Sequence, residues 1–133
     1  MEAIDLYNLR LMGSHPVNLL VRFLLEIAGL VALGLLGWHF GKGVYRYLLA
    51  PGLPLMAAVL WGTFAVPDDP GRSGNTIVQT PGFVRLLLEL AFFISATGSL
   101  FVIGATNLGW VYGVAVFVHY VVSYDRVLWL INQ

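Results

Sequence analysis

Long apolar stretches alternate with short polar ones along this chain. The apolar stretches cover about residues 17–38, 47–66, 82–104 and 110–131, and each is long enough for a transmembrane helix, which needs about 20 mostly apolar residues. Between the second and third lies "PDDPGRSGNTIVQTP", whose composition indicates an aqueous loop. The other connections, "FGKGVYR" and "ATNLG", are short, which makes consecutive helices antiparallel neighbours. The pattern predicts an all-α integral membrane bundle of four transmembrane helices.

Composition supports the lipid bilayer as the main partner. Of 133 residues, 59% are hydrophobic and 11% are charged, whereas a soluble domain has about 25% charged residues. The net charge is zero, which argues against nucleic acid as a partner. Residues 1–16 lack a basic segment followed by an apolar one, so they predict a cytoplasmic extension rather than a signal peptide. Residues 17–133 form the predicted transmembrane domain.

Two similar ten-residue segments occur in the chain. "VRFLLEIAGL" begins at Val21 and "VRLLLELAFF" begins at Val84, and each opens an odd-numbered span. Each copy would then comprise a helical hairpin, and both hairpins would point the same way across the membrane. The sequence therefore predicts two helical-hairpin repeats in parallel orientation.

Both of these similar segments contain charged residues within apolar sequence. Each copy has an arginine and a glutamate four residues apart, hence on one helix face, and the fourth span returns an aspartate and an arginine to the same depth. The predicted intramembrane charge layer comprises Arg22, Glu26, Arg85, Glu89, Asp125 and Arg126. The indole N–H of Trp61, together with Thr63, is expected to support it as a neutral hydrogen-bonding group. Pairing within each helix and pairing crossed between the first and third spans fit the sequence equally well.

Buried ionisable groups in a membrane pair with one another and often mark function. The balanced charges favour a structural clasp that joins the helices. The alternatives are a site of transport, proton transfer or catalysis, and a contact to a ligand or lipid headgroup.

Histidine offers one further candidate site. His119 lies inside the fourth span and could be an axial ligand for haem or a chlorophyll-type pigment, although a hydrogen bond to a neighbouring helix is the commoner role. No cofactor is expected and no metal site is predicted, because cysteine is absent and the histidines lie at different depths. The sequence contains no nucleophile elbow, zinc-protease motif, P-loop or dinucleotide fingerprint. We therefore expect no catalytic residues and no enzyme activity.

Basic residues are distributed unequally between the two sides of the predicted bundle. Five of the seven lie on the side of the termini and the long loop, namely Arg10, Arg22, Arg72, Arg85 and Arg126. Lys42 and Arg46 lie on the other side. The positive-inside rule then predicts that both termini are cytoplasmic.

Three stretches resemble the YrdB-like family of small bacterial membrane proteins, a domain of unknown function. They are "NLLVRFLLEIAGLVALGLLGW", "GLPLMAAVLWGTFAVP" and "RLLLELAFF", and the resemblance extends over about residues 17–133. Positions that match the family pattern are Arg22, Glu26, Trp61, Gly62, Thr63, Pro67, Arg85 and Glu89. The extension before Pro16 and the polar insert at residues 68–80 depart from it. The resemblance implies four spans in a bacterial inner (plasma) membrane and supplies no activity.

These features predict a small structural or accessory subunit of a larger membrane protein complex. The spans at residues 17–38 and 110–131 are apolar nearly all round apart from glycine stripes, which suits contact with other integral membrane proteins, self-association or lipid. The alternatives are a small-solute or proton transporter that uses the Arg/Glu layer, and pigment or haem binding through His119.

Overall fold

The computed structural model describes residues 16–67 and 77–133, which form an all-helical bundle. Five helices lie in these ranges: α2 (Pro16–Phe40), α3 (Val44–Thr63), α4 (Gly82–Val102), α5 (Thr106–Val122) and α6 (Tyr124–Ile131). Two short strands, β1 (Phe64–Ala65) and β2 (Val78–Gln79), connect α3 to α4. Residues 1–15 of the extension expected at 1–16, and most of the polar loop, lie outside the described residues.

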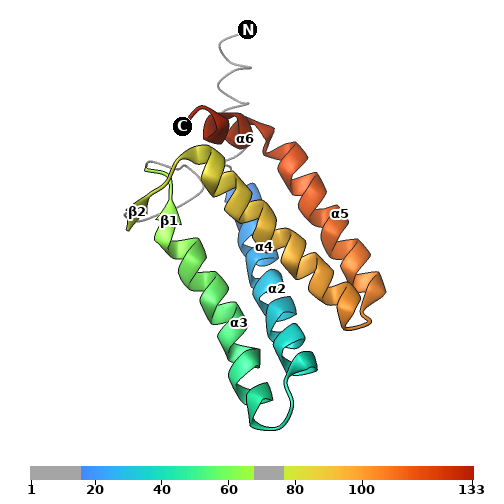
Figure 1. The fold of residues 1–133 in the computed structure, drawn as a ribbon. Coiled ribbons are helices and arrows are strands. Elements are labelled where there is room, and N and C mark those ends of the chain that lie inside the picture. The colour runs from blue at the N-terminus through green and yellow to red at the C-terminus, as the bar shows by residue number, and fades with distance from the viewer. Residues whose placement is uncertain (1–15, 68–76) are drawn as a thin grey trace, which may run out of the picture.

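The helices form two antiparallel hairpins that meet along α2 and α4 (Figure 1). Helix α3 packs on α2 and barely touches α4, whereas α5 packs mainly on α4. Both tight turns contain a glycine with a positive φ, Gly43 at 59° and Gly104 at 88°, a conformation that other residues adopt only with strain. The short connections thus set the antiparallel arrangement that the sequence predicted.

Gly37 near the end of α2 and Gly41 in the turn after it let α3 approach closely. The backbone of Leu49 lies directly against Gly37, and the backbone of Arg46 lies directly against Gly41. Side chains at these two positions would separate the helices, so small residues are needed for this contact. Glycines in this part of the chain therefore serve the packing of α2 against α3 within the hairpin.

Three helices, α2, α3 and α4, are long and apolar enough to cross a membrane. The segment expected as the fourth span is divided, because α5 ends at Val122 and α6 begins at Tyr124 with a bend of 70°. The pair meets the same criterion of length and apolarity if it is taken as one broken span. A long-range contact holds the break, since Asn18 Nδ2 donates a hydrogen bond to Ser123 Oγ at 2.7 Å and ties the turn to α2.

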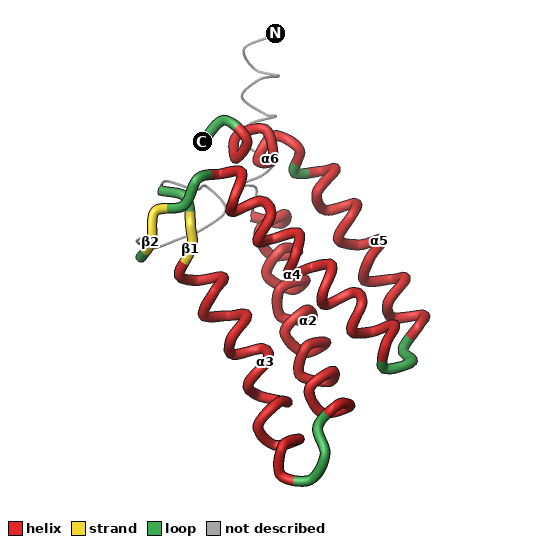
Figure 2. The backbone as a smooth tube through the Cα atoms, in the orientation of Figure 1, coloured by secondary structure: helices red, strands yellow, loops and turns green. Residues whose placement is uncertain are grey.

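Helix α6 lies across the end of the bundle at which α2 and α4 begin (Figure 1). Its backbone at Leu130 is in direct contact with Gly82, the first residue of α4. At the same end, β1 and β2 pair in parallel with Phe64 opposite Val78 and Ala65 opposite Gln79 (Figure 2). The strand pair, which the sequence did not predict, ends α3 at Thr63 rather than near residue 66.

The hydrophobic core lies midway along the bundle, and most of the outer surface is apolar. The core residues are Leu25, Ala32, Phe93, Ala96, Leu100 and Tyr112. Tyr112 Oη donates a hydrogen bond to the Leu25 carbonyl oxygen at 2.8 Å, which satisfies the hydroxyl inside the core. Helix α3 contributes no fully buried residue, and many of its apolar side chains lie on the outer surface.

Candidate functional site

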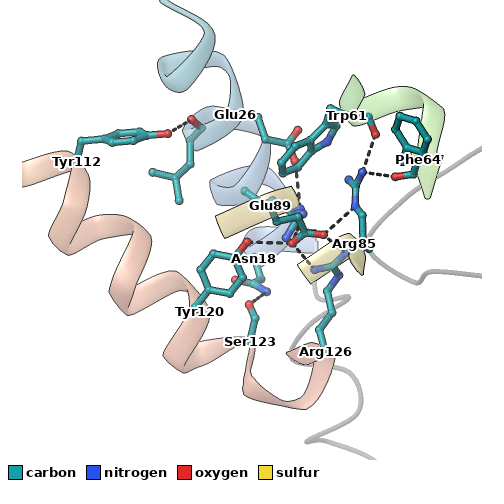
Figure 3. Close-up of polar contacts among 12 residues, drawn as sticks. Asn18, Glu26, Trp61, Phe64, Arg85, Glu89, Tyr112, Tyr120, Ser123 and Arg126 are labelled. Atoms are coloured by element: carbon teal, nitrogen blue, oxygen red, sulfur yellow. Dashed lines mark hydrogen bonds and ion pairs between the residues drawn. The ribbon is translucent and has the colours of Figure 1, made fainter. Parts of the chain in front are cut away.

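Glu89 of α4 lies at the centre of a buried ion cluster (Figure 3). Arg126 of α6 binds both of its carboxylate oxygens, with Nη1–Oε1 and Nη2–Oε2 distances of 2.9 Å each. Arg22 of α2 contacts Oε1 through Nη2 at 2.9 Å, and Arg85 contacts Oε2 through Nε at 3.0 Å. The Glu89 side chain has no exposed surface and the three arginine side chains are almost fully buried. Three helices therefore converge on one carboxylate.

Tyr120 of α5 completes the surroundings of this carboxylate. Its hydroxyl donates a hydrogen bond to Glu89 Oε1 at 2.9 Å. A carboxylate has about four lone-pair sites, and Glu89 already receives contacts from three arginines and a tyrosine. The hydrogen-bonding capacity of Glu89 is thus used by the protein itself.

Arg85 extends the cluster to the end of α3. Its Nη1 donates hydrogen bonds to the carbonyl oxygens of Trp61 at 2.7 Å and Phe64 at 2.6 Å. Its guanidinium also stacks over the Trp61 ring, 4.4 Å from the centroid, and the guanidinium of Arg22 lies 5.4 Å from the same centroid. Such contacts suit the flat, delocalised guanidinium group. The contribution of Trp61 is therefore a carbonyl and a ring face, whereas the expectation concerned its indole N–H.

Glu26, the counterpart of Glu89 in the first hairpin, occupies a different environment. It contacts Arg22 Nε through Oε1 at 3.1 Å, and its side chain remains 23% exposed. Arg22 thus bridges both glutamates. Pairing within each helix and crossed pairing, which the sequence left open, occur together, and the crossed contact runs from Arg22 to Glu89.

Asp125, an expected member of the layer, and Thr63, an expected supporting residue, are less buried than Glu89 and its three arginines. Asp125 is half-buried beside Arg126 at the start of α6, where a carboxylate also faces the positive end of the helix dipole. Thr63 is the last residue of α3 and is likewise half-buried. The contacts that α5 and α6 make to Glu89 come from Tyr120 and Arg126.

His119 is buried beside the cluster with a relative exposure of 4%. In the described part of the chain, neither ring nitrogen has a hydrogen-bond partner. A buried polar group left without a partner costs about 1–3 kcal/mol of stability. Among residues 16–67 and 77–133, no group of three His, Asp or Glu side chains could hold a metal ion.

The sequence did not indicate the roles of Tyr120, Asn18 and Ser123. Tyr120 and Arg126 are six residues apart and would lie at different depths along a straight helix. The bend after α5 brings both of them to Glu89. Their contacts with Glu89 could have been predicted from the sequence only if the bend had been known.

Comparison with known proteins gives a family and a relative. The profile of a family described as "Protein of unknown function (DUF2568)" matches residues 20–117. The chain is 40% identical over 119 residues to "Uncharacterized protein YrdB" of Bacillus subtilis (strain 168), a match that covers 90% of this chain and 97% of the relative. No solved structure matches the chain. The region matched by the family includes both Arg/Glu pairs and ends before Arg126.

Proposed function

This chain belongs to the DUF2568 family of proteins of unknown function, and we propose that it is a non-catalytic structural or accessory subunit of a larger membrane protein complex. The observation that carries the proposal is helix α3. Its 20 residues include none that are buried, and the exposed side chains Leu55, Met56 and Val59 are all apolar. In a bilayer this outer face would be available for a neighbouring transmembrane helix.

The membrane setting has independent support. Helices α2, α3 and α4 have the length and apolarity of membrane spans, and the bent pair α5–α6 would be a fourth if it forms one broken span. The beginning of α2 and the end of α6 lie at one end of the bundle (Figure 1). We place both termini in the cytoplasm of a bacterial cell, because the basic residues favour that side.

The ion cluster serves as a clasp in this proposal. It fastens α2, α4, α5 and α6 to one carboxylate, and Arg85 adds the end of α3. A carboxylate whose oxygens are all engaged has little capacity to bind and release a substrate. The clasp would hold the bundle in one shape while α3 meets its partner.

The two hairpins also fit an origin by duplication. Arg22–Glu26 and Arg85–Glu89 are both i,i+4 ion pairs near the start of the first helix of a hairpin, at 3.1 and 3.0 Å. Only the second copy became the centre of the cluster. We propose a parallel repeat in which the two copies have diverged in role.

Site-specific photo-crosslinking in the native membrane tests the accessory role. A photo-reactive residue at Met56 or Val59 on α3 is expected to capture a defined protein, which then co-purifies stoichiometrically in mild detergent and is identified by mass spectrometry. Phe117 on α5 is the matched control, since it is also apolar and exposed. Equal crosslinking to lipid from both helices, with a partner-free chain after purification, would exclude this role.

Glu26 supports a second candidate, a small-solute or proton transporter. Its carboxylate is partly exposed and shares Arg22 with Glu89, so it could change its protonation state without dismantling the cluster. Glu26→Gln should then abolish flux into proteoliposomes while the protein stays folded. Unchanged flux, or no flux in the unmodified chain, would rule this candidate out.

A further inference from the structure

A groove with His119 among its lining residues runs along the bundle between α2 and α5. Its volume is about 690 Å³, and it is lined by Val17, Asn18, Val21, Ala115, Val118, His119 and Val122. The valines at its edges are 38–62% exposed, so the groove opens to the surroundings of the protein. Helices α2 and α5 make few direct contacts with each other, which leaves room between them.

The histidine is the unusual member of this lining. A neutral imidazole has one donor and one acceptor nitrogen, and in the described residues neither has a partner. Hydrocarbon offers no water to supply these bonds. Both nitrogens have almost no accessible surface, so a rotation of the His119 ring toward the groove would let an oxygen of a molecule seated there satisfy one of them.

The other lining residues restrict the chemistry of that molecule. Five of the seven are valine or alanine, and the lining has no charged side chain. A charged headgroup would therefore have no counter-ion in the groove. The volume is within the range of about 300–1,000 Å³ typical of small-molecule sites, so the occupant would be of cofactor or lipid size.

We propose that this groove binds a neutral, lipid-soluble molecule whose polar end is a carbonyl or hydroxyl oxygen hydrogen-bonded to His119. Such a molecule would enter sideways from the bilayer, because the exposed valines border the groove. The inference rests on the proposed membrane location and is independent of the accessory role. Failure of the α3 crosslinks would therefore leave it standing.

Haem is disfavoured by the same lining. Its two carboxylates need cationic or polar partners, and the nearest arginine on α2, Arg22, is engaged by Glu26 and Glu89. The amide of Asn18 already donates to Ser123 Oγ. Axial ligation by His119 would thus bring two carboxylates to an apolar groove.

Binding to the full chain in lipid nanodiscs tests the proposal with two neutral probes, 1,2-dioctanoylglycerol and decylubiquinone. We expect saturable, stoichiometric binding of at least one, and the one that binds identifies the source as an acylglycerol or a quinone. His119→Leu should weaken binding by about tenfold, the factor expected for a lost hydrogen bond in an apolar site. ¹⁵N NMR of the His119 ring should shift on addition of the probe.

Two further variants separate binding from folding. Val118→Trp fills the groove from an exposed position and should also abolish binding while the protein stays folded. His39→Leu changes an exposed histidine at the opposite end of α2 and should leave binding unchanged. Absence of saturable binding by both probes, or equal binding by His119→Leu, would overturn the proposal. So would stoichiometric haem binding that depends on His119.

Discussion

At the scale of single residues, Glu89 and Glu26 have the same sequence context and different surroundings. Glu89 is in contact with three guanidinium groups and a hydroxyl, whereas Glu26 has one ion pair at the edge of the cluster. Removing one partner from a buried ion network leaves uncompensated charge, and that is far more costly than losing an exposed pair.

Neutralising the two glutamates should therefore have unequal effects. Glu89→Gln is expected to lower the free energy of unfolding by about 3–5 kcal/mol, because three buried guanidinium groups lose their shared anion. Glu26→Gln should lower it by about 1 kcal/mol or less, because that side chain is partly exposed. Unfolding by SDS in mixed micelles measures both values. Equal losses would show that Glu89 is not the centre of the clasp.

The shape of the guanidinium matters as well as its charge. Arg85 contacts Glu89, two backbone carbonyls and the face of Trp61, and a lysine ammonium cannot make this set. Arg85→Lys should cost about 1–3 kcal/mol through carbonyl oxygens left without a partner.

Arg46 provides the control for this substitution. It stacks on Trp38 at 4.6 Å and donates to the Trp38 carbonyl oxygen at 3.1 Å, near the surface at the other end of the bundle. Arg46→Lys should change the free energy of unfolding by less than about 1 kcal/mol. If the two substitutions prove equally harmful, burial is not what makes Arg85 important.

At the scale of elements, the α2–α3 hairpin depends on close backbone contact. A Cβ added at Gly37 would overlap the backbone of Leu49, whereas nothing lies within 4 Å of one added at Gly52. Gly37→Ala is expected to destabilise the protein by about 1–3 kcal/mol through overpacking.

Gly52→Ala serves as the matched substitution in the facing helix. It should leave stability unchanged or raise it by about 0.5–1 kcal/mol, because alanine favours the helix. Both variants can be followed by SDS unfolding. A stable Gly37→Ala protein would mean that α2 and α3 can move apart without loss of stability.

Local sequence patterns predicted the long helices but not their ends. Apolar length located α2, α3 and α4 to within a few residues, and the R-x-x-x-E spacing found both ion pairs. The break at Ser123 depends on a hydrogen bond to Asn18, more than one hundred residues earlier in the chain. The parallel pairing of β1 with β2 is likewise a long-range contact. Periodicity within one segment carries no information about such contacts.

At the scale of the whole molecule, the arrangement of the ends can be tested directly. The start of α2 and the end of α6 lie together, and the turn after α2 lies at the opposite end (Figure 1). Because the natural chain has no cysteine, a single introduced cysteine reports one position without ambiguity.

We predict opposite labelling of two single-cysteine variants in intact bacteria. Lys42→Cys, in the turn between α2 and α3, should react with a membrane-impermeant maleimide. Gln133→Cys should react only after the membrane is opened, because the basic residues near that end favour the cytoplasm. Labelling of both from one side would contradict a four-span topology, and reversed labelling would contradict the orientation alone.

The chain position of Arg126 has a consequence for biogenesis. A ribosome makes Arg22, Arg85 and Glu89 before Arg126, which supplies two of the hydrogen bonds to the central carboxylate. A nascent or truncated chain without α6 therefore holds an incomplete ion network within apolar surroundings. We expect membrane proteases to recognise and degrade such a chain. Only a chain that includes α6 would then persist in the membrane.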